Sequence, residues 1–219
     1  MSTAILVPSL NRPQRLAGLI ANIHETTEDF RLYFCVSDPE SKRILTEAGE
    51  WFLDDSDTDD RRYVTRMNKL VRCLQDEEHL FFGSDDVVHH PGWLTSAQAM
   101  LVERGTQLTV VNDLRNASGT QAVIKREYLA RAVFDSPGDA FHHGYTHNFA
   151  DNEMWVTAGV QAEYSRAMDS IVEHLHPLFK QANSAPWDDT YRTAMTGWAH
   201  DETLFQRRHA AIMEWAKTL

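Results

Sequence analysis

The chain has few cysteines and no long apolar run, and each absence excludes a class of protein. Its two cysteines, Cys35 and Cys73, are too few for a disulfide scaffold; each lies in an apolar run, so we expect buried, reduced thiols. The first eight residues lack the basic segment and the apolar length of a signal peptide. No stretch approaches the roughly 20 apolar residues of a membrane span. We therefore expect a cytoplasmic protein without a membrane span.

Basic residues are also scarce. The chain has 21 Lys and Arg against 32 Asp and Glu, a net charge of -11. This balance argues against tight binding to a nucleic-acid backbone unless basic residues gather locally. The basic cluster before residue 80 consists of Arg61, Arg62, Arg66, Lys69 and Arg72.

The residues that are present predict one domain with alternating strands and helices. A length of 219 residues with 42% hydrophobic content suffices for a large core, and no repeat or linker divides the chain. Apolar runs predict strands at 4–7, 31–36, 80–82, 108–111 and 121–124. Helical spacing of apolar residues predicts helices from 13 onward and at 41–49, 65–76, 93–104, 127–133, 152–158 and 200–217. This order is typical of an α/β fold with a mainly parallel sheet and a helical C-terminal part.

Two adjacent carboxylates, Asp85 and Asp86, follow the apolar run 80–82 and the break at Gly83. They therefore lie where a strand leaves the sheet, which is where open α/β folds bind their ligands. Paired carboxylates at such a place favour a hard divalent cation that carries phosphate groups. The alternative is a turn in which one of the two caps the next segment.

Two further segments carry polar groups at element boundaries. The turn from Pro8 to Arg12 opens a helix, whose free N–H groups and nearby arginine favour an anion; a capped helix with a solvated arginine is the alternative. His174 and His176 stand two apart on an extended segment and so point to one face, as transition-metal ligands require. Two surface histidines are the alternative.

Acidic residues form two more groups. Asp151 and Glu153 begin a predicted helix, where they act either as caps for the helix dipole or as a general base. Residues 54–60 imitate the opening of a calcium loop, but Asp60 holds the place of the required glycine and Arg66 that of the closing glutamate. We interpret this segment as a solvated acidic loop.

Taken in order, these segments resemble the family-2 glycosyltransferases of the GT-A fold, particularly the small stand-alone enzymes often carried by phages. The resemblance spans about residues 4–177 and rests on the strand and turn at 5–12, Asp38, residues 67–69, the carboxylate strand with its turn at 81–94, residues 121–129, 151–153 with Gly159, and 172–174. Residues 121–129 resemble a strand that carries a basic pair. The order of the pieces is far more specific than any single motif.

The resemblance implies a GT-A, Rossmann-like fold and a site for a nucleotide-sugar donor, a UDP- or GDP-sugar, with Mn²⁺ or Mg²⁺. The implied nucleotide-binding residues are Pro8, Ser9, Asn11, Arg12, Asp38, Asn68, Ser84 and Asp85. The implied metal ligands are Asp85 and His174, with Asp86 and His176 as second choices. The implied reaction is hexosyl or pentosyl transfer to an acceptor hydroxyl, with inversion expected, and the general base stays open between Asp151 and Glu153.

The sequence departs from the family pattern at two places. Gly83 stands where the first Asp of the Asp-x-Asp motif is expected, and the base motif reads Asp-Asn-Glu rather than Glu-Asp. Two other functions therefore stay open. A nucleotidyltransferase would normally have a glycine-rich run after the first strand, where this chain has Pro8-Ser9-Leu10-Asn11. A non-catalytic nucleotide- or metal-binding module of the same fold is the second alternative.

The resemblance also divides the single domain, residues 1–219, into three parts. Residues 1–111 are expected to form the nucleotide-binding half, 112–180 the acceptor and metal half, and 181–219 a helical C-terminal extension. The sequence leaves the donor sugar and the acceptor undetermined. A modified DNA base is one acceptor that a phage enzyme would use, in which case the protein would work in the cytoplasm of the host.

Overall fold

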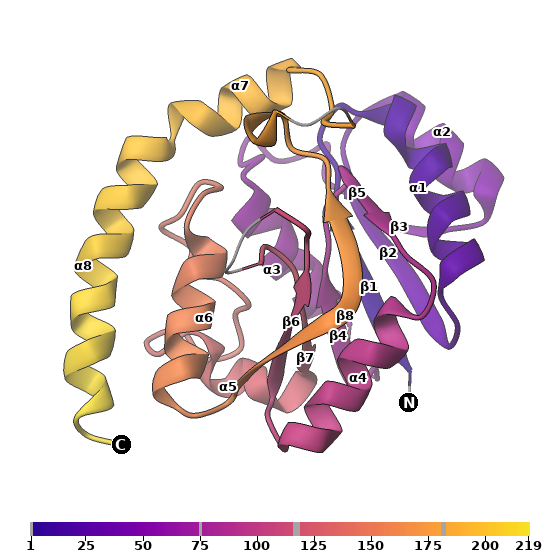
Figure 1. Cartoon of the computed structure of the whole chain (residues 1–219). Helices are drawn as coiled ribbons and strands as arrows, with labels where there is room; N and C mark the ends of the chain where they lie inside the picture. Colours follow the sequence, from indigo (N-terminus) through magenta and orange to yellow (C-terminus); the bar gives the residue numbers. More distant parts are fainter. Residues whose placement is uncertain (1, 75, 116–118, 181–182) are drawn as a thin grey trace.

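The computed structural model describes residues 2–74, 76–115, 119–180 and 183–219 (Figure 1). Its strands are β1 (Thr3–Pro8), β2 (Phe30–Val36), β3 (Trp51–Asp54), β4 (His79–Phe82), β5 (Val87–His89), β6 (Leu108–Asn112), β7 (Ala122–Lys125) and β8 (Tyr164–His174). Its helices are α1 (Pro13–Thr26), α2 (Pro39–Ala48), α3 (Tyr63–Cys73), α4 (Trp93–Arg104), α5 (Leu129–Ala132), α6 (Ala150–Val160), α7 (Asp189–Thr196) and α8 (Trp198–Ala216), with short 3-10 helices at Arg126–Tyr128 and Pro177–Phe179.

The described strands form one sheet in the order β3-β2-β1-β4-β7-β6-β8-β5. Strands β1 to β4, β6 and β8 run in one direction, while β7 and β5 are antiparallel to their neighbours. The prediction of a mixed, mainly parallel sheet flanked by helices is therefore confirmed. Because six strands share a direction, their carboxyl ends meet at one edge of the sheet, where the loops that follow them gather.

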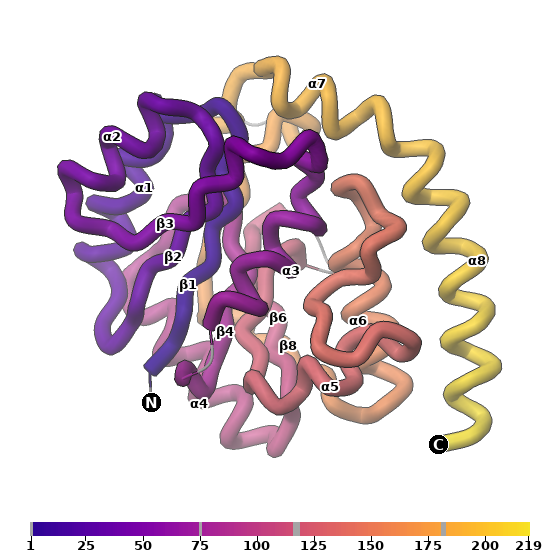
Figure 2. The backbone as a smooth tube through the Cα atoms, turned by 180° about the vertical axis from the view of Figure 1, so that it is seen from behind, coloured from indigo at the N-terminus to yellow at the C-terminus, as the bar shows by residue number. Residues whose placement is uncertain are grey.

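Two apolar layers cover the sheet. Strands β1 and β4 lie at its centre and are buried along their whole length, which explains why they appear in the sequence as short continuous apolar runs. One face packs against α1, α2 and α4, and the other against α3 and α6. Helix α8 lies outside α6 as a further layer, and Figure 2 shows the two helices side by side. In the part of the chain that the structure describes, no helix is long and apolar enough to cross a membrane.

Several local expectations were wrong or incomplete. The strands β3 and β5 were not predicted because they have only four and three residues and lie at the edges of the sheet. Helix α7 was also missed. Cys35 is buried as expected, whereas Cys73 is exposed at the end of α3.

The acidic segment 54–60 is not simply a solvated loop. Asp55 is buried and accepts hydrogen bonds from Arg66 Nε at 3.0 Å and Lys69 Nζ at 2.5 Å. Arg66, on the inner face of α3, also donates to the carbonyl of Ser9 at 2.8 Å and to the hydroxyl of Ser37 at 2.9 Å. The acidic residue was misinterpreted because its cationic partners lie one helix further along the chain.

Candidate active site

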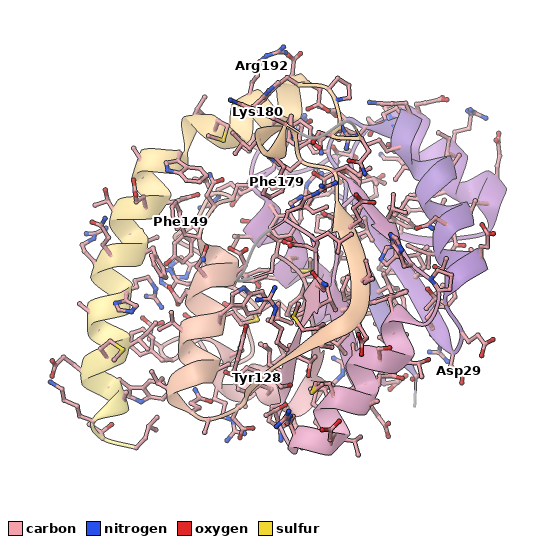
Figure 3. All side chains as sticks on the ribbon, in the orientation of Figure 1. Asp29, Tyr128, Phe149, Phe179, Lys180 and Arg192 are labelled. Atoms are coloured by element: carbon pink, nitrogen blue, oxygen red, sulfur yellow. The ribbon has the colours of Figure 1, made fainter. Side chains whose placement is uncertain are left out.

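A cavity of about 570 Å³ opens at the edge of the sheet where the carboxyl ends of the strands meet. Turns after β1, β4 and β8, the loop before α6, and helices α7 and α8 contribute to its walls. Figure 3 shows Phe149 and Phe179 in this region, below α7. Of the residues predicted for the site, eight line the cavity: Pro8, Arg12, Ser84, Asp85, Asp86, Asp151, His174 and His176.

The first carboxylate of the pair, Asp85, is held by the turn after β1. The hydroxyl of Ser9 donates to Asp85 Oδ2 at 2.7 Å, and Arg12 Nη1 donates to Oδ1 at 2.8 Å. Burial raises the pKa of the Asp85 carboxyl, while the positive charge of Arg12 opposes that rise. Asp85 therefore links the nucleotide turn to the end of β4.

The second carboxylate, Asp86, is the one that contacts the histidine. Asp86 Oδ2 lies 3.3 Å from His174 Nε2 and accepts a hydrogen bond from the Tyr191 hydroxyl at 2.8 Å. Burial raises the pKa of Asp86, but His174, Ser84 and Arg12 together outweigh burial and hold this pKa well below its usual range. The Asp86 charge in turn raises the pKa of His174 above its ordinary value, against burial. The structure thus pairs His174 with Asp86, the second choice of the sequence interpretation, rather than with Asp85.

The two histidines of the predicted pair lie close together, with ring centroids 5.6 Å apart. His174 Nδ1 lies 3.2 Å from the hydroxyl of Thr120, so both ring nitrogens of His174 have partners. His176 is engaged differently: its Nδ1 accepts from the backbone N–H of Leu178 at 3.2 Å, and burial lowers its pKa to about 4. His176 is therefore neutral at ordinary pH.

These residues fit a divalent cation only together with further ligands. Among the residues that the structure describes, no group of three or more His, Cys, Asp or Glu side chains is arranged to hold a metal ion. Asp86 and His174 supply two protein donors, a carboxylate oxygen and an imidazole nitrogen. Mg²⁺ and similar ions are commonly held by one or two protein ligands plus substrate phosphates and water. The donor set therefore fits a cation that arrives with a diphosphate.

The departure at Gly83 has a steric reason. A Cβ atom at this position would lie 3.1 Å from the ring of Phe81 and 3.2 Å from the carbonyl oxygen of Leu6, so a larger residue requires one of them to move. The carbonyl oxygen of Gly83 accepts a hydrogen bond from the Tyr63 hydroxyl at 3.1 Å. An aspartate at position 83 would require the Phe81 ring or the Leu6 carbonyl to shift by a few tenths of an ångström.

The two candidate bases face different surroundings. Glu153 is buried; it accepts hydrogen bonds from the Tyr145 hydroxyl at 2.7 Å and from Arg208 Nε and Nη2 at 2.6 and 2.8 Å. Asp151 lines the cavity, and burial raises the pKa of its carboxyl to about 6. Its oxygen Oδ1 accepts from the adjacent backbone N–H of Asn152, at 2.9 Å. The geometry therefore favours Asp151, because Glu153 is engaged in an ion pair between α6 and α8.

The remaining predicted nucleotide residues do not line the cavity. Asn11 is exposed with φ of 53°, and Asp38 caps α2 by accepting from the N–H of Ser41 at 2.8 Å. The second oxygen of Asp38 is buried and has no hydrogen-bond partner among the described residues. Asn68 is buried, and its amide bonds the backbone of Ala140 and Phe141. Asn68 thus holds the loop before α6 in place and does not itself line the cavity.

Sequence reasoning missed a residue that shapes the cavity from the C-terminal side. Asp201, in the first turn of α8, is fully buried and accepts from the backbone N–H groups of Thr146, His147 and Asn148 at 2.9, 2.9 and 2.8 Å. It also accepts from the hydroxyl of Thr146 at 2.7 Å. Its acidic side chain at a helix start looks in sequence like any dipole-favoured residue, so no signal identifies its partners.

The solved structures most informative about this fold are glycosyltransferases. The chain matches a mannosyltransferase from Pyrobaculum calidifontis in complex with GDP-Man and Mn²⁺, with a TM-score of 0.64, 15% identity, and coverage of 99% of this chain and 75% of that one. It matches S. aureus TarS 1-349 in complex with UDP-GlcNAc, with a TM-score of 0.61, 11% identity, and coverage of 78% and 57%. The third is glucosyl-3-phosphoglycerate synthase from Mycobacterium tuberculosis in complex with Mn²⁺, UDP-glucose and phosphoglyceric acid, with a TM-score of 0.58, 12% identity, and coverage of 82% and 74%.

The comparisons by sequence give no match. No protein-family model matches the chain, and no curated protein matches it by sequence. Likeness at 11–15% identity establishes architecture alone. The mainly parallel sheet with its flanking helices agrees with these structures, and the chain therefore has the fold of the GT-A glycosyltransferases.

Proposed function

We propose that the protein is a metal-dependent glycosyltransferase that moves a sugar from a nucleotide-sugar donor to an acceptor hydroxyl. The observation that carries this proposal is the meeting of Asp86, His174 and Asp151 in one cavity at the carboxyl edge of the sheet. These groups come from the turn between β4 and β5, the end of β8 and the start of α6. The fold supports the proposal, since similar structures bind GDP-Man, UDP-GlcNAc or UDP-glucose.

Asp151 is the proposed general base. Its carboxylate takes the proton of the acceptor hydroxyl while the acceptor oxygen bonds to the anomeric carbon and the bond from that carbon to the phosphate oxygen breaks. Attack from the face opposite the leaving diphosphate inverts the anomeric centre. A pKa of about 6 leaves Asp151 ionised at neutral pH and basic enough to accept a proton.

Asp86 and His174 are the proposed metal ligands, and Asp85 with Ser9 and Arg12 positions them from the nucleotide side. A bound Mn²⁺ or Mg²⁺ would stabilise the negative charge of the leaving diphosphate. The protein must also keep water away from the donor, and Phe141, Phe149 and Phe179 supply apolar walls for this purpose.

The experiment is a calorimetric screen of UDP, GDP and their sugars with and without Mn²⁺, followed by turnover with the donors that bind. We expect metal-dependent binding of one nucleotide, and its loss in Asp86→Asn. Asp169→Asn is the matched control because Asp169 is exposed on β8, away from the cavity. Wild-type protein that binds neither nucleotide would contradict the proposal, and binding without any turnover would favour a non-catalytic module.

A further inference from the structure

A carboxylate at the start of α7 contacts two arginines, one in the turn before α1 and one within α1. Arg12 Nε and Nη2 donate to Asp188 Oδ2 and Oδ1 at 2.9 and 2.8 Å, a bidentate pair. Arg15 Nη2 lies 3.4 Å from Asp188 Oδ2. A planar guanidinium bonds two oxygens of a phosphate in the same way as two oxygens of a carboxylate. The pair of arginines is therefore an anion site that a side chain of this chain occupies.

The next turn of α7 covers the acidic pair. The Tyr191 hydroxyl donates to Asp86 Oδ2 at 2.8 Å and accepts from Arg15 Nη1 at 3.0 Å. The Tyr191 ring lies 3.9 Å from the guanidinium carbon of Arg12, a cation–π contact. Thr190 Oγ1 also donates to the carbonyl of Leu10 at 2.9 Å. Helix α7 is thus fastened across the turn between β1 and α1.

Exposure indicates which partner of Arg12 is able to leave. Only 6% of the Arg12 side chain is exposed, and Asp85 below it is at 4%, whereas the side chain of Asp188 is 28% exposed. Asp85 lies in the turn between β4 and β5, beside the buried residues of the sheet, while Asp188 precedes α7 and contacts the site from outside. An incoming anion would therefore displace Asp188 and leave the pair of Arg12 with Asp85 in place.

We propose that Arg12 and Arg15 form the site for the diphosphate of the donor, and that the Asp188 carboxylate fills this site until the donor displaces it. The proposal rests on the proposed function and assigns a role to Arg15, Asp188 and Tyr191. Displacement also moves the Tyr191 hydroxyl away from Asp86, which frees a carboxylate oxygen for the cation. One movement of α7 thus opens both the diphosphate site and the metal site.

The occupied state lowers the apparent affinity for the donor. When only a fraction of the molecules has an open site, the apparent dissociation constant is the intrinsic constant divided by that fraction. A partly exposed ion pair contributes up to about 1 kcal/mol, which corresponds to roughly a fivefold difference in affinity. Neutralising Asp188 should remove most of that penalty, because an amide is a weaker partner for guanidinium than a carboxylate.

The test compares Asp188→Asn with Asp189→Asn by calorimetric titration of UDP and of GDP in the presence of Mn²⁺ at fixed ionic strength. Asp189 is the matched control because it is the next residue, its carboxylate is 99% exposed, and its ion pair is with Arg192 on the same helix. We expect Asp188→Asn to bind the preferred nucleotide about fivefold more tightly, while Asp189→Asn binds as wild type does. Equal or weaker binding by Asp188→Asn overturns the proposal.

The second arm concerns Arg15 and inorganic pyrophosphate, a probe without base or sugar. Arg15→Gln should weaken pyrophosphate and nucleotide binding at least fivefold, and Arg192→Gln, an exposed arginine of α7, should not. If neither nucleotide nor pyrophosphate binds to wild type or any variant, the proposed function fails as well. If a nucleotide binds with Mn²⁺ but Arg15→Gln and Asp188→Asn bind it as wild type does, only the present inference fails.

A measurement on the wild-type chain covers the case in which Asp188→Asn does not fold. Amide hydrogen exchange within α7 should become faster when nucleotide and Mn²⁺ bind, because the helix loses its contacts with Arg12, Leu10 and Asp86. Exchange in α8 should stay unchanged, since Asp201 holds that helix to the loop before α6. Unchanged or slower exchange in α7 contradicts displacement.

Discussion

Replacement of Asp151 by asparagine should make the protein more stable and inactive. The carboxylate lies in the cavity, where burial raises its pKa from 3.8 to about 6. At neutral pH the folded protein therefore holds an ionised group that its surroundings disfavour. Asparagine is nearly isosteric and neutral, so Asp151→Asn removes this penalty, and it also removes the proposed proton acceptor.

The magnitude follows from the pKa shift. A shift from 3.8 to about 6 corresponds to an upper limit of about 3 kcal/mol at about 1.36 kcal/mol per unit. Because the Asp151 residue is only partly buried, water screens part of the penalty, and we expect a gain of about 1–2 kcal/mol. For a chain of this size that gain raises the melting temperature by about 3–6 °C.

The sign of the pH dependence is specific. Because the pKa is raised in the folded state, the unfolded carboxyl loses its proton first, so the contribution of Asp151 to the stability of the wild type falls as pH rises from about 4 to about 6 and is constant above. The advantage of Asp151→Asn should therefore be complete at pH 7 and absent near pH 4. Urea denaturation at both pH values measures it, with Asp169→Asn as the exposed control.

Turnover completes the test. Loss of a general base lowers kcat by about 10²–10⁴. The reasoning is refuted if Asp151→Asn keeps wild-type kcat, or if its stability relative to wild type is the same at pH 4 and pH 7. A variant that is inactive and destabilised would mean that the carboxylate is structural.

Three further predictions follow from neighbouring groups. Glu153→Gln should lower the free energy of unfolding by about 1.5–3 kcal/mol in urea denaturation, because it removes one of the two carboxylates that pair with Arg208 and leaves the other, Asp135, in place. Its kcat per folded molecule should stay within a few-fold of wild type, and a loss as large as that of Asp151→Asn would reassign the base. The wild-type kcat/KM should fall about tenfold per pH unit below about pH 6, as Asp151 gains its proton, and a profile flat down to pH 5 would contradict that role. Asp201→Ala should lower the free energy of unfolding by about 2–4 kcal/mol at pH 7, since the loop before α6 loses its hydrogen-bond acceptor. Hydrogen bonds from that loop outweigh burial and lower the pKa of Asp201, so this loss of stability should shrink as pH falls below about 4. A loss that is independent of pH would refute the charge argument.

The sequence predicted the central part of the fold and the place of the site. The runs in β1, β2 and β4 are apolar because these strands are buried inside the sheet, and burial of this kind leaves a local signal that needs no partner. The residues after parallel strands meet at one edge by direction alone, which places Asp85 at the ligand-binding edge of the sheet. The resemblance implied that Arg12 and His174 join it, and the structure brings all three to one cavity.

The sequence did not predict the short edge strands β3 and β5 because four and three residues leave little pattern, and the side chains of β3 are also partly exposed. It also left the base open between Asp151 and Glu153, which differ by two positions on one helix turn. Their surroundings differ because Arg208 of α8 reaches Glu153 and not the cavity-lining Asp151.

What the sequence by itself determined is therefore the α/β order and the edge of the sheet that carries the polar groups. Both depend on local periodicity and strand direction. The tertiary structure alone decided which carboxylate contacts His174, which acid faces the cavity, and that Asp188 occupies the arginines of the nucleotide turn. These features depend on pairs of residues that are 55 to 176 positions apart in the sequence. Such partners meet only when the chain has folded, and their burial and their charge interactions are fixed only then.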